Sequence, residues 1–87
     1  MITEEFKSLF NAIIPEFDTD LLTAESSMGR PEEWDSIANL NLLLAIEETY
    51  SVRFSMEEMA VLDNIEKIGE RLLEDGVKIV DTELSVS

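Results

Sequence analysis

The chain has 87 residues, 45% of them hydrophobic, which predicts one small domain around a single compact core. Its 20 acidic and 6 basic residues give a formal charge of −14, which argues against nucleic acids and anionic membranes as partners, because both attract clustered lysine and arginine. Protein partners with basic patches are favoured instead. The lack of histidine and cysteine excludes thiolate nucleophiles, disulfides and the commonest general bases.

The N-terminal residues lack the basic segment and apolar run of a signal peptide, and no stretch reaches the roughly 20 apolar residues that cross a membrane. We therefore expect a soluble, cytoplasmic monomer without membrane insertion. The common phosphate-loop, zinc-protease and calcium-loop motifs are also missing, so we expect no metal site and no catalytic residues.

The first expected helix begins after Thr3, an N-cap, and carries two glutamates in its first turn, where the helix dipole favours negative charge. Pro15 disfavours helical geometry in the residue before it, so the helix should end at Ile13 or Ile14. Apolar residues at helical spacing define its buried face: Phe6, Leu9, Phe10, Ile13 and Ile14.

A long connection, residues 15–33, follows and is rich in turn residues. A loop of this length in so small a domain is often functional, but a packed crossover between two helices is the favoured interpretation. Leu21 and Leu22 are predicted to form one helical turn. Four apolar side chains should attach the loop to the core: Phe17, Leu21, Leu22 and Met28.

The most apolar segment, residues 36–50, predicts the central helix, because a helix this apolar must be contacted on more than one side. It contains neither glycine nor proline and should begin at Asp35 or Ser36. The positions at core-facing spacing are Ile37, Leu40, Leu43, Leu44, Glu47 and Tyr50, and Leu42 and Ile46 broaden the apolar surface.

A short third helix over residues 56–61 is predicted by a capping box, in which Ser55 is the N-cap and Glu58 the third helical residue. This helix is long enough for only one or two turns. It should present Met59 and Leu62 to the core. The expected fold is therefore all-α, a bundle of four helices with a short third helix and a long first connection.

The last helix should start at a second capping box, from Asp63 to Glu66, and end near Gly76. Its buried face would comprise Ile65, Ile68 and Leu72, with Leu73 as a further candidate. The domain is accordingly expected to span residues 1–76. Residues 77–87 would form a partly disordered extension, in which the first apolar side chains can still dock on the core.

Ser36 is the residue on which the functional interpretation depends. After Asp35 and before an apolar helical run, it has the pattern of an N-cap. A helix N-terminus, with unpaired N–H groups and a positive dipole end, also stabilises a phosphate, so Ser36 suits the attachment of a phosphodiester-linked group. From the residues alone, the cap is the favoured alternative.

The segment around Ser36 resembles the acyl carrier protein family. That family has Asp-Ser-Leu at the start of its second helix, followed by an Ala-Leu-Glu-Glu-like run and an aromatic residue. The corresponding residues here are Asp35-Ser36-Ile37, Ala45-Ile46-Glu47-Glu48 and Tyr50, and Phe54, Glu57-Glu58 and Ile65 fall where the family has its third helix and the start of its fourth. The resemblance extends from Phe6 to about Leu73 and includes length and acidity.

The resemblance implies a non-catalytic, four-helix carrier. Ser36 would carry 4′-phosphopantetheine, transferred from coenzyme A by a phosphopantetheinyl transferase, and the arm would hold acyl groups as thioesters for ligases or synthases. Asp35 would assist the complex with the transferase, and a role at the helix dipole is an equal alternative for it. Partner enzymes would contact Trp34, Ile37, Asn41, Leu44, Glu47 and Glu48. An acyl chain would enter a space lined by Met28, Leu40, Leu44, Phe54, Met59 and Leu62, for which ordinary core packing is the alternative.

Three residues depart from the carriers of general fatty acid synthesis: Trp34 replaces a small residue, and Asn39 and Asn41 stand where acidic residues are frequent. An exposed Trp34 would anchor a partner, whereas a buried one would belong to the bundle. The departures favour a specialised carrier of lipid or secondary metabolism. Peptidyl and D-alanyl carriers are alternatives within the class. A non-covalent acidic interaction module, with Ser36 only a cap, is the alternative outside it.

Overall fold

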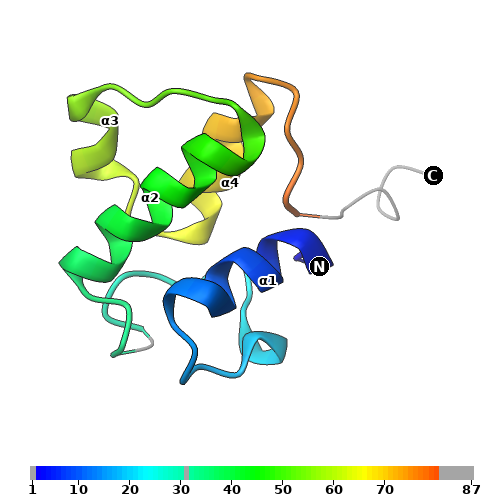
Figure 1. The fold of residues 1–87 in the computed structure, drawn as a ribbon, viewed down its shortest axis with the longest axis vertical. Helices are drawn as coiled ribbons and strands as arrows, with labels where there is room; N and C mark the ends of the chain where they lie inside the picture. Colours follow the sequence, from blue (N-terminus) through cyan, green and yellow to red (C-terminus); the bar gives the residue numbers. More distant parts are fainter. Residues whose placement is uncertain (1, 31, 81–87) are drawn as a thin grey trace.

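The computed structural model describes residues 2–30 and 32–80, and over these ranges the protein is all-α, as predicted. A short 3-10 turn, η1 (Thr19–Leu21), lies between the first two helices. Helix α2 runs diagonally through the middle of the molecule, and the other helices surround it (Figure 1). The helices of the described residues are α1 (Glu4–Ile13), α2 (Ser36–Tyr50), α3 (Met56–Val61) and α4 (Ile65–Leu73).

Helix α1 begins and ends as predicted. The Thr3 hydroxyl accepts a hydrogen bond from the Phe6 backbone N–H at 3.3 Å, and the helix ends at Ile13, two residues before Pro15. Phe6 and Phe10 are fully buried and turn the apolar face of α1 toward α2. The local signals of cap, dipole and proline therefore predict where this helix begins and ends, and its packing on α2 stabilises it.

Helix α2 has apolar residues on both sides, and the predicted core face is partly wrong. The buried side chains are those of Asn39, Leu42, Leu43 and Ile46. Ile37, Leu40 and Leu44, which were expected to face the core, are exposed to 71%, 47% and 47%. Helical periodicity cannot choose between two apolar faces, and the other described helices of so small a domain cover only one of them.

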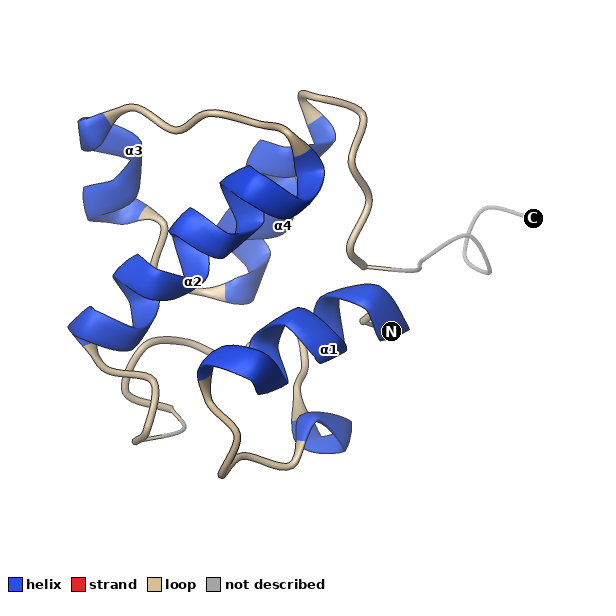
Figure 2. Cartoon of the chain, in the orientation of Figure 1, coloured by secondary structure: helices blue, strands red, loops and turns tan. Residues whose placement is uncertain are grey.

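The loop between α1 and α2, drawn in tan in Figure 2, is a packed crossover. Phe17 packs edge-on against Phe10, with ring centroids 5.9 Å apart, and Leu22 is buried, as predicted. Leu21 and Met28 are 66% and 38% exposed, so their predicted attachment to the core is wrong. The backbone supplies the attachment instead, since the Met28 N–H donates to the Asp63 carbonyl at 2.8 Å.

Both later helices are capped by side chains. In α3, the Ser55 hydroxyl accepts from the Glu58 N–H at 3.0 Å, and the Glu58 carboxylate accepts from the Ser55 N–H at 2.8 Å, which confirms the capping box. The N-cap of α4 is Asn64, whose side chain accepts from the Lys67 N–H at 2.7 Å, and not the predicted Asp63. Asp and Asn are nearly equal as caps, so the sequence alone leaves this register open by one residue.

Arg71 on α4 joins α4 to α3 and to the segment before α3. Its Nε donates to Glu58 Oε2 at 2.7 Å, its Nη1 to Asp75 Oδ2 at 3.0 Å and its Nη2 to the Arg53 carbonyl at 2.8 Å. The guanidinium carbon also lies 5.4 Å from the centroid of the Phe54 ring. One side chain thus holds the N-terminal end of α3 in place, a position that helical periodicity does not predict.

The folded domain continues past residue 76, where the sequence predicted its end. Gly76 has a positive φ of 78°, which suits its predicted role after the last helix, although α4 already ends at Leu73. Leu73 is 56% exposed, so its predicted place on the buried face of α4 is wrong. Ile79 is buried and its carbonyl accepts from the Thr3 N–H at 2.8 Å, while Val80 forms a bridge with Ile2. Residues 77–80 therefore belong to the domain. The predicted disorder at residues 81–87 lies outside the described residues.

Candidate functional site

Ser36 is the first residue of α2 and is exposed. It is not the N-cap. That role belongs to Asp35, whose Oδ1 accepts a hydrogen bond from the Ala38 backbone N–H at 2.8 Å. The interpretation of Ser36 as only a cap is therefore wrong, because the Asp35 carboxylate already accepts from the Ala38 N–H at the start of the helix. Within the described residues, the Ser36 hydroxyl makes no hydrogen bond.

The start of α2 offers hydrogen-bond donors beside the Ser36 hydroxyl. The backbone N–H groups of Ser36 and Ile37 precede the first intrahelical bond, from the Asn39 N–H to the Asp35 carbonyl at 2.8 Å, and have no acceptor among residues 2–30 and 32–80. Such groups and the positive end of the helix dipole favour an anion attached here. The Asp35 carboxylate opposes part of this attraction, since like charges repel at short range.

The exposed face of α2 is apolar next to Ser36 and acidic farther along. Ile37, Leu40 and Leu44 form its apolar part, at helical spacing, and the exposed Glu48 lies one turn beyond Leu44. Asn41 is exposed on this face as well. These four predicted contact residues, Ile37, Asn41, Leu44 and Glu48, are therefore accessible on one side of the helix.

Glu47 has a structural role that the sequence did not indicate. It is half-buried, and its Oε2 accepts a hydrogen bond from the Phe54 backbone N–H at 2.8 Å. This bond ties the last turns of α2 to the segment that leads into α3. The carboxylate is therefore already engaged within the fold, which sets Glu47 apart from the other predicted contact residues on α2.

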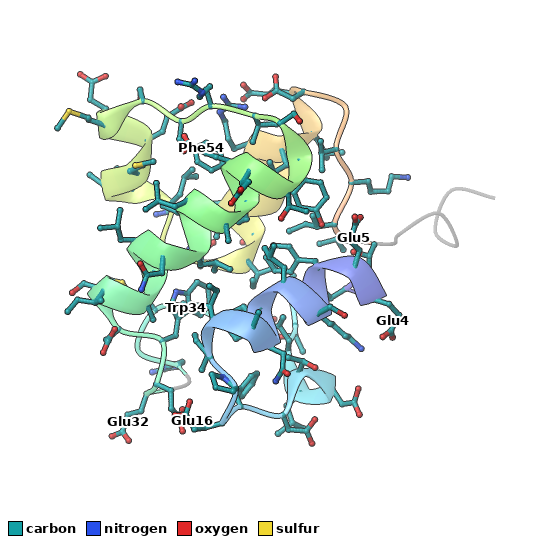
Figure 3. The ribbon with its side chains drawn as sticks, in the orientation of Figure 1. Glu4, Glu5, Glu16, Glu32, Trp34 and Phe54 are labelled. Carbon is teal, nitrogen blue, oxygen red and sulfur yellow. The ribbon has the colours of Figure 1, made fainter. Side chains whose placement is uncertain are left out.

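Trp34, predicted as an exposed anchor for partners, is completely buried. Figure 3 shows it in the interior between α1 and α2. Its ring packs edge-on against Phe10, with centroids 5.3 Å apart, and its Nε1 donates to Asn39 Oδ1 at 2.9 Å. The anchor interpretation is wrong because the indole finds both an aromatic neighbour and a hydrogen-bond acceptor inside the bundle.

The six residues predicted to line an acyl pocket do not share one environment. Phe54 and Leu62 are buried in the core and Met59 packs against it, whereas Leu40 and Leu44 lie on the exposed face of α2 and Met28 on the surface of the loop. Ordinary core packing, the alternative to an acyl pocket, therefore describes Phe54, Met59 and Leu62. Leu40 and Leu44 face solvent because α2 turns its opposite side toward α1, and Met28 is exposed on the loop before α2.

A hollow of about 400 Å³ lies beside Ser36, between the end of α1 and the start of α2. Three carboxylates line it, those of Glu16, Glu33 and Asp35, around a partly apolar floor that includes Pro15 and Ile37. Charges of this sign suit a cationic side chain with an aliphatic stem better than an acyl chain. Sequence reasoning did not predict this hollow, because the long loop separates its two sides along the chain.

Asn39, which sequence reasoning grouped with Asn41 as a departure that alters partner docking on α2, is buried, so that interpretation is wrong for Asn39. It is the buried polar residue of the described core, 6% exposed, and its amide contacts both Trp34 and the Leu62 carbonyl. A signal was present: Asn39 lies three, four and seven residues before Leu42, Leu43 and Ile46, which are buried. A polar residue on the core stripe of a helix needs a buried partner.

The two residues at the start of α2 should differ in their effect on stability. Asp35→Ala removes the cap and should lower the free energy of unfolding by about 1 kcal/mol. Ser36→Ala should change it by less than about 0.5 kcal/mol, because the Ser36 side chain is exposed and forms no hydrogen bond with the residues that the structure describes. Urea denaturation followed by circular dichroism measures both. A larger loss for Ser36→Ala than for Asp35→Ala would contradict this assignment of the cap.

Comparison with known proteins identifies no relative. The chain matches no protein-family model, no curated protein and no solved structure. Within the described residues, no helix combines the length and apolarity needed to span a bilayer. The resemblance to acyl carriers thus depends on the residues of this chain alone, and the geometry around Ser36 is the basis for a functional proposal.

Proposed function

We propose that this protein is a cytoplasmic, monomeric carrier that holds acyl groups as thioesters on a 4′-phosphopantetheine arm attached to Ser36. The observation that carries the proposal is the Ser36 hydroxyl, which is exposed at the first position of α2 and free of the capping role that Asp35 performs. Modification of an exposed hydroxyl that does not cap the helix should change the stability of the fold little. The resemblance of residues 35–50 to carrier proteins supplies the identity of the group.

The attachment reaction needs no catalytic group from the carrier. The Ser36 oxygen forms a bond to the phosphorus that bears the pantetheine arm, the bond to the nucleotide part of coenzyme A breaks, and the transferase takes the hydroxyl proton. The N–H groups of Ser36 and Ile37, which have no acceptor in the described part of the chain, lie next to the new phosphodiester and favour its negative charge. The lack of histidine and cysteine is consistent with such a passive role.

Partner enzymes would dock on the exposed face of α2. Ile37, Leu40 and Leu44 offer an apolar surface beside the arm, and such exposed apolar residues gather at interaction sites. The formal charge of −14 steers this surface toward enzymes with basic patches. The hollow lined by Glu16, Glu33 and Asp35 is suited to receive a lysine or arginine of the transferase or of a loading ligase.

The test is modification of the purified protein by coenzyme A and a broad-range phosphopantetheinyl transferase, followed by intact mass measurement. Wild type should gain the mass of one phosphopantetheinyl group, and Ser36→Ala should gain none. Ser8→Ala, a matched change at an exposed serine of α1, should be modified like wild type. An unmodified wild type, or a gain that persists in Ser36→Ala, would exclude the carrier and leave the acidic interaction module.

The cargo is identified by the same measurement on protein isolated from its source. Fragmentation ejects the arm with its bound group, whose mass distinguishes a fatty acyl chain from an amino acid or a peptide. An acyl chain is expected for the proposed carrier of lipid or secondary metabolism. An aminoacyl group would assign the chain to the peptidyl or D-alanyl carriers instead.

A further inference from the structure

The side-chain amide of Asn39 links three separate segments of the fold. Its Oδ1 accepts from Trp34 Nε1, in the loop before α2, at 2.9 Å, and its Nδ2 donates to the carbonyl of Leu62, the C-cap of α3, at 3.1 Å. Trp34 is fully buried, and Asn39 and Leu62 are 6% and 5% exposed. Hydrogen bonds at such depth are shielded from competing water.

Trp34 determines which way the amide faces. An indole N–H can only donate and a carbonyl can only accept, so Asn39 satisfies both neighbours in one orientation. The flipped amide would set donor against donor at Trp34 and acceptor against acceptor at Leu62. The ring of Trp34 is itself held against Phe10 of α1, so the orientation of the amide is fixed by the core.

Helix α3 depends on this bond more than a longer helix would. It has six residues, and isolated helices of this length do not persist in water. The capping box at Ser55 and the contacts of Arg71 hold its N-terminal end. At its C-terminal end, the carbonyl of Leu62 is held by Asn39, which fixes the end of α3 against the first half of α2.

We propose that Asn39, oriented by Trp34, is a positioning residue for the modification of Ser36. Exposed apolar side chains lie on both helices that the amide joins: Ile37 and Leu40 on α2, and Met56 and Val61 on α3. The amide holds these two parts in one fixed arrangement, so that the transferase meets a single preformed surface. This inference rests on the proposed function. Asn39 is buried and touches no substrate.

If Asn39 positions the docking surface, its loss should raise the KM of the transferase for the carrier and leave kcat nearly unchanged. Ser36 is at the start of α2, and its local geometry depends on the Asp35 cap rather than on α3. Once the transferase is bound, the attacking hydroxyl is therefore placed as in wild type. Loosening α3 makes the docking surface variable, which weakens binding before the chemical step.

The experiment compares transferase kinetics for wild type, Asn39→Leu and Trp34→Phe, at a temperature at which circular dichroism shows each variant folded. Asn39→Leu removes both hydrogen bonds at similar volume and should raise the KM for the carrier about tenfold, with kcat within about twofold. Trp34→Phe removes only the orienting donor and should raise KM by a smaller factor. Asn11→Leu, the same change on the exposed side of α1, should match wild type.

Amide hydrogen exchange provides a readout that does not depend on the carrier reaction. In α3, the N–H groups of Met59 and Leu62 should exchange faster in both variants, while those in α1 keep their wild-type rates. An unchanged KM in both variants, with wild type modified normally, would overturn the positioning role and leave the carrier function intact. A fall in kcat alone would overturn it too. Complete absence of modification in wild type would overturn both.

Discussion

Replacing Trp34 by alanine should remove most of the free energy of unfolding of this protein. The indole is fully buried, packs edge-on against Phe10 and donates to Asn39. Large-to-small changes of a buried aromatic residue cost about 3–5 kcal/mol, since both the burial and the packing of its neighbours are lost. Domains as small as this one are typically stable by about 5 kcal/mol or little more, so the variant retains a small margin at most.

Urea denaturation followed by far-ultraviolet circular dichroism measures this effect, because Trp34 is also the only tryptophan and its fluorescence is lost in the variant. Trp34→Phe keeps an aromatic ring but leaves Asn39 Oδ1 without its donor, which should cost about 1–3 kcal/mol. Leu44→Ala is the surface control and should cost less than about 1 kcal/mol, because Leu44 is 47% exposed. Equal losses of unfolding free energy for Trp34→Ala and Leu44→Ala would indicate that Trp34 lies on the surface.

Local sequence signals predicted the helices of this fold well, because each signal acts within a few residues. Thr3 and Ser55 cap the helices that follow them, and Pro15 lies just past the end of α1. Where a signal was ambiguous, the error was one residue: Asp63 was preferred to its neighbour Asn64 as the cap of α4. Hydrogen bonds between a side chain and the next turn of backbone need no tertiary structure to be recognised.

The sequence did not determine which faces of the helices pack against each other. Helix α2 has two apolar faces, and its orientation is decided by which face meets α1, information that no periodicity within α2 contains. The burial of Trp34 follows from the same choice, because the core face of α2 presents Asn39 as its hydrogen-bond acceptor. One decision about helix rotation thus accounts for the exposed Leu40 and Leu44 as well.

The structure confirms that α2 starts at Ser36, but the capping role that the sequence favoured for Ser36 belongs to Asp35. Asp35 and Ser36 are both good N-caps, so composition could not assign the cap, and only the bond from the Ala38 N–H to Asp35 decides. That bond leaves the Ser36 hydroxyl exposed. The hollow at Glu16 and Glu33 could not be predicted, since it depends on how the long loop brings α1 and α2 together.

Arg71→Met should also lower the free energy of unfolding, because Arg71 joins α4 to α3 and to the segment before it. The arginine side chain is only 16% exposed, and the change breaks its bond to the Arg53 carbonyl and its contact with the Phe54 ring. These losses cost about 2 kcal/mol, whereas the ion pair with Asp75, whose side chain is 43% exposed, adds little. Arg53→Met is the matched control, because Arg53 is exposed, and it should change stability by less than about 0.5 kcal/mol.

The effect of Arg71 should also depend on pH through Glu58. The backbone N–H of Ser55 and, next, the Arg71 side chain hold the pKa of Glu58 below its ordinary value of 4.5. A carboxylate with a lowered pKa stabilises the fold fully above its unfolded value, and this stabilisation disappears as the pH falls through the lower folded value. The stability difference between wild type and Arg71→Met should therefore be constant near neutral pH and shrink below about pH 4.5. Urea denaturation of both proteins across this range measures it, and a difference that grows on acidification would show that Glu58 is not the partner through which Arg71 secures α3.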